Sequence, residues 1–349
     1  MTNLNNQSSF VPGRLEQMST RIAFFIAGLG IAAWAPLVPY AKARAGLDEG
    51  TLGLLLLCLG VGSILAMPMA GLLATRFGCR KVATGGTLLI CVALPLLATV
   101  SSIPALIAAL FLFGAGLGTV DSTVNLQAVI VERASGKNMM SGFHGMFSLG
   151  GIVGAAGVSA LLGLGLSPLG ATLVVIILLL VALAKAAPHL LPYGSERSGP
   201  AFAVPHGIVL FIGGMCFIVF LTEGAALDWS AVFLAQERGI DKAYAGLGYA
   251  AFALTMTVGR LTGDSIVHRL GATRVIVFGG VTAAIGLFLA TFARAGKRRC
   301  WAMHCWASAA RTLCRCCTPP WASRRSCQRA SLCRPLPLSA TRGYLRDLQ

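Results

Sequence analysis

Charged residues are scarce in this chain. They make up 11% of its 349 residues, whereas an average soluble domain has about a quarter. Only 12 residues are acidic, while hydrophobic types account for 56% and the mean hydropathy is +0.77. This composition excludes an ordinary soluble domain, and we expect the lipid bilayer to be the solvent of the chain.

The sequence also lacks the short motifs of several functional classes. No G-x-x-x-x-G-K-[ST] loop is present, so we expect no ATP-driven step in this chain. The acids and His144 are scattered, without the spacing of a nucleophile pair or a metal site. We therefore expect no enzyme, no metal site and no cofactor.

The hydrophobic residues fall in blocks of about 20, the length of a helix that crosses the hydrocarbon core. The alternation of a barrel strand is missing, and Gly and Ala run through the blocks, which favours packed helices. The sequence therefore predicts an all-α membrane protein. Its nine expected spans are 21–41, 51–74, 82–100, 104–130, 140–163, 168–187, 206–227, 243–263 and 272–292.

Basic residues in the short loops predict the orientation of the chain. Residues 1–20 are polar and have no cleavable signal layout, so the first span should act as the targeting signal. With the N-terminus in the cytoplasm, twelve Lys and Arg residues fall in cytoplasmic loops and four fall outside. We expect a multi-pass protein of the bacterial inner membrane with a cytoplasmic N-terminus.

A shift of 193 positions superimposes loop residues from two parts of the chain. The matches place Gly46, Asp48, Gly53, Arg76 and Gly78 on Gly239, Asp241, Gly246, Arg269 and Gly271. Trp34 and Trp229 match at a shift of 195. The sequence thus predicts a tail (1–20), a six-helix bundle (21–187), a cytoplasmic linker (188–205), a partial three-helix bundle (206–293) and an unusual tail (294–349).

The loop between the second and third spans runs from Gly71 through Arg76, Gly78 and Arg80 to Lys81. It resembles the signature loop of the major facilitator superfamily, although Thr75 stands where that loop has an acid. The equivalent segment after the eighth span contains Arg260, Asp264, Arg269 and Gly271. Arg260 and Asp264 are four residues apart and can pair on one helix face, where we expect a conformational latch; a purely topogenic Arg260 is the alternative.

Three further segments resemble the YbjJ-like and MosC-like bacterial branch of this superfamily: Val120-Asp121 with Asn125, the run 142–150 around His144, and the run 223–229. The resemblance covers about residues 20–293. It implies a twelve-span fold with two six-helix bundles around a central substrate cavity. For relatives of MosC it suggests a rhizopine-like, sugar-like solute.

Two intramembrane acids are the first candidates for a transport pathway, because a carboxylate in a span normally faces a cavity or a partner. Asp121 shares a helix face with Asn125, and a structural tie to Asn125 or Gln127 is the alternative. Glu223 is the acid of the seventh span that lies one turn deeper than Asp228. Both acids could contact substrate or carry a proton.

Aromatic residues and one histidine complete the candidate pathway. Trp34 and Trp229 could, with Asp228, hold a polyol or an amine at the mouth of a cavity, or Trp229 could belong to an interfacial belt. The ordinary pKa of a histidine would let His144 take part in proton coupling, and hydrogen-bonded packing is the alternative.

Most of the net charge of +16 belongs to the last segment. Residues 297–349 carry +10 of that charge and seven of the eleven cysteines. The cysteine spacing fits no regular zinc site, and an out-of-frame origin explains the enrichment better than binding to lipid or RNA. The second bundle would then hold three of its six spans.

The sequence thus predicts a secondary active transporter of a small polar solute, sugar-like or a related metabolite, which works by alternating access with protons as a candidate coupling ion. A non-transporting, truncated or frameshifted membrane protein is the alternative. We expect the lipid bilayer and a small-molecule substrate as partners, no nucleic acid, and a monomer.

Overall fold

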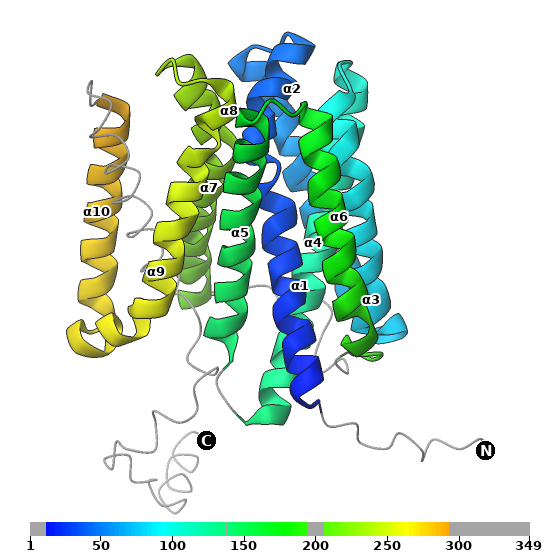
Figure 1. The fold of residues 1–349 in the computed structure, drawn as a ribbon. Coiled ribbons are helices and arrows are strands. Elements are labelled where there is room, and N and C mark those ends of the chain that lie inside the picture. The colour runs from blue at the N-terminus through cyan, green and yellow to red at the C-terminus, as the bar shows by residue number, and fades with distance from the viewer. Residues whose placement is uncertain (1–11, 137–138, 195–205, 293–349) are drawn as a thin grey trace, which may run out of the picture.

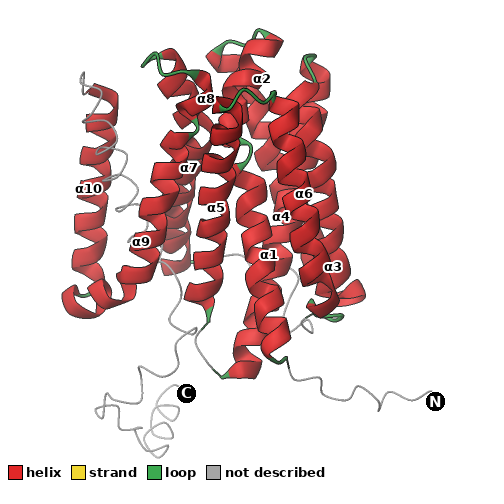
Figure 2. Cartoon of the chain, viewed as in Figure 1, coloured by secondary structure: helices red, strands yellow, loops and turns green. Residues whose placement is uncertain are grey.

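The computed structural model describes residues 12–136, 139–194 and 206–292. Every regular element in these ranges is a helix, as Figure 2 shows. The tail 294–349 predicted from composition lies outside them. So do the side chains of Arg260 and Asp264, although both residues fall on a described helix.

In the described ranges, ten α-helices and two short 3-10 helices build two groups that stand side by side (Figure 1). The first half contains α1 Arg14–Ala32, η1 Ala35–Leu37, α2 Val38–Ala45, α3 Glu49–Thr99, α4 Ile103–Ser135, α5 Met140–Gly163, α6 Pro168–Ala186 and η2 Ala187–His189. The second half contains α7 Ile208–Gln236, α8 Lys242–Ala245, α9 Leu247–Leu270 and α10 Ala272–Phe292. Helix α5 packs against α9 and joins the halves.

Helix α3 consists of two antiparallel segments that meet at Gly78, whose φ of 84° and ψ of 155° are not helical. Before this residue, α3 runs parallel to α4, because Leu59 meets Gly114 and Ser63 meets Gly118. After it, the order reverses, because Gly86 meets Thr119 and Ile90 meets Gly116. The chain therefore turns back at Gly78, and α3 supplies two of the predicted spans.

Each of the nine predicted spans overlaps a helix of the described part, the eighth on α9 and the ninth on α10. Six helices of the described part are long and apolar enough to cross a membrane: Arg14–Ala45 with its break, Glu49–Thr99, Ile103–Ser135, Met140–Gly163, Pro168–His189 and Ile208–Gln236. The seventh span was predicted to end at residue 227, but α7 continues to Gln236, because Asp228 and Trp229 are accommodated within the helix.

The predicted repeat is confirmed by backbone geometry at the end of the bundle that carries α2 and α8. Gly46 and Gly239 both adopt the left-handed conformation, with φ of 64° and 63°. Two residues further on, Asp48 accepts a hydrogen bond from Thr51 N, and Asp241 accepts one from Ala243 N, so each caps the next helix. The second half therefore repeats the turn chemistry of the first.

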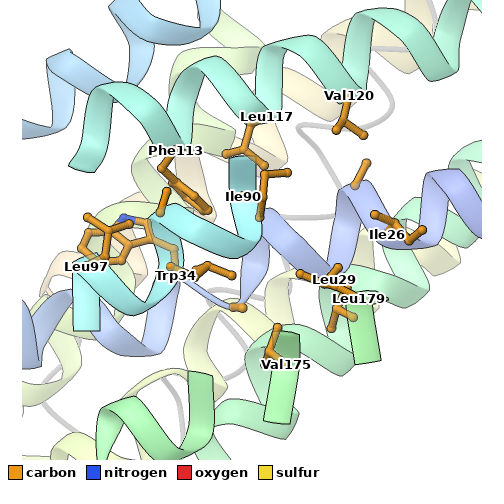
Figure 3. Close-up of a cluster of buried hydrophobic side chains, with 14 of the residues drawn as sticks. Ile26, Leu29, Trp34, Ile90, Leu97, Phe113, Leu117, Val120, Val175 and Leu179 are labelled. Carbon is orange, nitrogen blue, oxygen red and sulfur yellow. The ribbon is translucent and has the colours of Figure 1, made fainter. Parts of the chain in front are cut away.

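The core of the first half lies between α1, α3, α4 and α6, where Ile26, Leu29, Ile90 and Leu179 are fully buried (Figure 3). Glycines bring α1 and α5 into close contact: a Cβ atom on Gly28 would lie 1.9 Å from Phe147 O. Such small-residue contacts are how helices pack closely without a hydrophobic driving force between them.

Polar side chains satisfy the helix ends. Arg44 donates to three carbonyls at the carboxyl end of α3: Leu97 O at 2.7 Å, Ala98 O at 2.8 Å and Val100 O at 3.0 Å. At the opposite end of the bundle, Glu132 Oε2 accepts hydrogen bonds from the backbone N–H groups of Met139 and Met140, both at 2.7 Å. Both contacts pair backbone groups that a helix leaves open.

Candidate functional site

Asp121 lies near the middle of α4, 18 residues after Ile103 and 14 before Ser135. Asn125, one turn further, donates from Nδ2 to Asp121 O at 2.9 Å and to Asp121 Oδ1 at 3.2 Å. Of the two ties considered from the sequence, the structure contains the one to Asn125. It holds the carboxylate in one orientation and leaves its second oxygen outside this contact.

Gln127 serves a different purpose on the same helix. Its Nε2 donates to Thr20 Oγ1 at 2.8 Å, and its Oε1 accepts from Leu191 N at 3.1 Å. The buried amide thereby connects α4 to α1 and to the segment that follows α6. Gln127 is a structural residue, separate from the Asp121 pair.

Glu223 occupies the matching depth in the second half. It lies 15 residues after Ile208 and 13 before Gln236, near the middle of α7. It lies within electrostatic range of the carboxyl group of Asp121. The two acids singled out from the sequence therefore face the same region, one from each half.

Trp34 lies in the break between α1 and η1 and is 1% exposed. Its ring packs 6.4 Å from that of Phe113, centroid to centroid, and beside Leu97 (Figure 3). The sequence placed Trp34 at the mouth of a cavity, but the indole is buried. The break itself has a local cause, because Pro36 and Pro39 cannot donate to a continuous helix.

The acid that Trp34 meets is Asp228 of the opposite half. The indole N–H comes close enough to interact with the Asp228 carboxyl group. The contact does not reach good hydrogen-bond geometry, and both Trp34 Nε1 and Asp228 Oδ1 are buried without a hydrogen-bond partner. Buried polar atoms are normally paired. These two atoms are therefore available to a polar group that enters between the halves.

Trp229 packs elsewhere. It is half-buried against the core of the first half, and a Cβ atom on Gly53 would lie 3.6 Å from its Cζ2. The indole thus contacts α3 across the junction of the halves.

His144, near the start of α5, meets Phe24 edge-on, with ring centroids 5.2 Å apart and an interplanar angle of 75°. This is the geometry expected for the packing interpretation of His144.

The loop motif surrounds the turn at Gly78. Arg80 donates from Nε to Leu190 O at 2.9 Å and from Nη2 to Pro188 O at 2.5 Å. Arg76 is exposed, with its guanidinium over the Phe77 ring at 5.2 Å. Arg80 therefore fastens the turn to the segment after α6.

The remaining motif residues play different parts. Lys81 is exposed beside Arg80, and around Gly71 there is open space. In the second half, Arg269 is exposed at the end of α9 and Gly271 forms the turn to α10. The structure does not describe the side chains of Arg260 and Asp264, so the latch between them stays a prediction.

Sequence reasoning missed Lys42 as a contact residue. It was counted as a loop charge, yet it is 4% exposed. Its Nζ forms an ion pair with Glu49 of the same half and donates to Gln236 Oε1 of the other half at 2.8 Å. A lysine that follows an apolar run carries no signal of such burial, although Glu49, seven residues on, offered a partner of opposite charge.

Backbone contacts join the halves at the same end. A Cβ atom on Gly246 would lie 2.3 Å from Ser159 Oγ and 2.5 Å from Pro36 Cγ. A buried cluster continues this junction toward the middle of the bundle; it contains Ala32, Ala35, Ala155, Ala226, Leu227, Tyr249, Ala250, Phe252, Ala253 and Met256. The end that carries α2 and α8 is therefore closed between the halves.

The described ranges contain no group of three His, Cys, Asp or Glu residues arranged to hold an ion. The polar candidates in the two halves are carboxylates, an amide and an indole. This set can donate and accept hydrogen bonds and can hold a proton, which suits binding better than covalent catalysis.

Comparison with known proteins identifies the fold and the family. A profile of the Major Facilitator Superfamily matches residues 21–303. An uncharacterised MFS-type transporter of Yersinia pestis is 54% identical over 286 residues, which cover 82% of this chain and 74% of that protein. The membrane protein MosC of Rhizobium meliloti is 30% identical over 287 residues, or 80% of this chain and 69% of MosC.

Solved structures of membrane transporters have a similar fold. The nucleoside transporter NupG aligns with a TM-score of 0.61 and 13% identity over 86% of this chain and 80% of its own. A bacterial homologue of the iron transporter ferroportin aligns with a TM-score of 0.53 and 16% identity over 86% of this chain and 82% of its own. This chain belongs to the major facilitator superfamily of membrane transporters.

Proposed function

We propose that this chain is a secondary active transporter that moves a small polar solute, sugar-like or a related metabolite, by alternating access together with protons. The observation that carries the proposal is the convergence of Asp121 and Glu223. These carboxylates come from opposite halves, near the middle of α4 and α7, and they lie within electrostatic range of each other. Transporter binding sites typically lie near the midplane between two repeats.

Two like charges close together in a bilayer are costly, so a proton or a substrate group that neutralises one of them is stabilised there. A site that binds a proton only while both acids face each other couples protonation to the position of the halves. Asp121 is held by Asn125, so we propose that Asp121 is the fixed member of the pair and that Glu223 moves with the second half.

The class of solute follows from the polar groups of α4, of α7 and of the break after α1. Asn125, Asp228 and the N–H of Trp34 supply donors and acceptors suited to hydroxyl groups. Trp34 lies where the first span is broken, and broken helices form the binding sites of many transporters. An amine that pairs with the two acids is the second solute class to test.

The closed junction at α2 and α8 corresponds to one of the two end states of alternating access. We propose that the halves rock about the α5–α9 contact and that the Lys42–Gln236 bond breaks when this end opens. We further propose a monomer in the bacterial inner membrane with a cytoplasmic N-terminus, which makes the Gly78 end cytoplasmic.

The test is uptake by the purified chain in proteoliposomes with an imposed proton gradient. Candidate sugars, polyols and amines are first ranked by thermal shift. Asp121→Asn and Glu223→Gln are expected to abolish gradient-driven uptake while insertion into the membrane is retained. Glu237→Gln is a matched control, because Glu237 lies at the exposed end of the same helix as Glu223.

The outcomes separate the alternatives. Gradient-driven uptake that survives both substitutions would refute the role of the two acids. Correctly inserted protein that takes up none of the solutes bound in the thermal screen would favour the non-transporting membrane protein considered from the sequence. Uptake lost equally in Glu237→Gln would point to a general loss of fold.

A further inference from the structure

We propose that the lipid-facing surface of α3 carries a binding site for one anionic glycerophospholipid, with its phosphate between Arg80 and Lys81 and an acyl chain along Gly85 and Leu88. The inference is independent of the transported solute. It rests on two grooves that meet at the same lysine, on the charge at one end of them, and on the apolar residues that follow.

The first groove has a volume of about 600 Å³ and lies between α3 and the end of α6, where Arg80, Lys81, Leu88, Ala184 and Pro188 line it. The second has a volume of about 320 Å³ and lies toward α4, where Phe77, Lys81, Leu89 and Thr119 line it. Lys81 and Gly85 line both grooves. The two hollows therefore flank one short stretch of α3.

The spacing of Lys81, Thr84, Gly85 and Leu88 places them on one face of the helix, at positions i, i+3, i+4 and i+7. This stripe begins with a cation beside the turn at Gly78 and continues toward the middle of the bundle through residues without charge. Leu88 is 45% exposed, and a Cβ atom on Gly85 would meet nothing within 4 Å. The order of charge and apolar surface matches a lipid with its headgroup at the membrane boundary.

The two cations are prepared for a phosphate in different ways. Two of the five N–H donors of Arg80 bond to carbonyls, which fixes the guanidinium and leaves three donors. Within the described ranges, no hydrogen bond or ion pair engages Lys81. Two positive charges with open donors favour a net anionic headgroup, because the ammonium group of a zwitterionic lipid would be repelled.

The experiment measures the thermal stability of the detergent-purified full chain during titration with phosphatidylglycerol, with phosphatidylethanolamine, and with inorganic phosphate. Phosphatidylglycerol is expected to raise the melting temperature saturably, and inorganic phosphate is not. Lys81→Gln is expected to raise the half-saturating lipid concentration about fivefold, because one basic side chain contributes about that factor to the affinity for an anionic lipid. Gly85→Leu, which fills both grooves, is expected to remove the saturable shift.

Lys185→Gln is the matched control, because Lys185 lies in the last turn of α6 at the same end but lines neither groove. It should keep the wild-type titration. Equal losses in Lys81→Gln and Lys185→Gln would reduce the effect to general surface charge and overturn the site. An unchanged shift in Gly85→Leu, or the same shift with inorganic phosphate alone, would also overturn it. Melting temperatures without added lipid check that each variant is folded.

Discussion

Gly78 and Gly271, 193 residues apart, form the same backbone turn: φ and ψ are 84° and 155° at the first and 80° and 151° at the second. This combination is open almost only to glycine. Gly78 reverses the chain within α3, and Gly271 reverses it between α9 and α10. The shared turn shows that the two halves run in parallel, as the offset in the sequence predicted.

The two glycines differ in their surroundings, which predicts a difference between their alanine variants. A Cβ atom at Gly78 would lie 2.0 Å from Pro192 O, whereas at Gly271 it would meet nothing within 4 Å. Gly271→Ala should therefore lower the free energy of unfolding only by the backbone strain that it introduces, about 1 to 3 kcal/mol. Gly78→Ala should lower the melting temperature in detergent further, because the Pro192 backbone must also move.

Gly60→Ala provides the control, since Gly60 is helical and has open space around its Cα. It should be neutral or slightly stabilising, as helix propensity favours alanine. Equal melting temperatures for Gly78→Ala and Gly271→Ala would contradict the close contact at Pro192.

Removing one charge of the Asp121–Glu223 pair should stabilise the fold while it stops transport. Asp121→Asn keeps an oxygen that accepts from Asn125 and relieves the repulsion from Glu223. We expect a higher melting temperature for Asp121→Asn and for Glu223→Gln, and a smaller added gain in the double variant. Strictly additive gains, measured in a double-mutant cycle, would show that the two carboxylates do not interact.

Lys42→Met should weaken the junction at the α2 and α8 end, because it removes the ion pair with Glu49 and the hydrogen bond to Gln236. Spin labels at Gly50 and Glu237, in a background without native cysteines, report the separation of the halves there. The distance distribution is expected to shift toward longer distances. Lys242→Met, at an exposed lysine of α8, should leave it unchanged; a shift of equal size would argue against a specific role for Lys42.

The pH dependence of one helix cap can be predicted with its sign. Hydrogen bonds from the Thr51 backbone N–H and hydroxyl lower the pKa of Asp48 below its ordinary 3.8. The carboxylate therefore stabilises the fold above 3.8, and this contribution is lost as the pH falls through the lower pKa of the folded state. The difference in melting temperature between wild type and Asp48→Ala should be constant at neutral pH and shrink below pH 3.8. A difference that persists unchanged to pH 2 would contradict the charged cap.

The fold was predictable to the extent that it depends on local chemistry. Hydrophobic length located the helices, and the glycine and aspartate matches located the repeated turns, because φ requirements and helix caps act within a few residues. The turn at Gly78, in the basic loop between the second and third predicted spans, also follows from its glycine. The end of α7 could not be predicted in this way. The length of a helix beyond the bilayer depends on what the acids of α7 contact in the other half.

The candidate site was predictable in part. Asp121 and Glu223 were visible because any acid inside a span is conspicuous. That they lie within electrostatic range of each other depends on how the halves pack, which no local pattern encodes. The burial of Trp34, the cross-half contact of Lys42 and the capping of α5 by Glu132 are likewise products of tertiary packing, because each side chain finds its partner on another helix or across a loop.

The bonds from Arg44 to Leu97, Ala98 and Val100 bear on how this protein adapts to its membrane. A helix that ends in open carbonyls must reach water, so its length is tied to the thickness of the bilayer. Here a side chain from the neighbouring α2 provides the donors that water would otherwise supply. This end of α3 can therefore lie below the headgroups, and a thicker bilayer need not thin locally or tilt the helix to accommodate it.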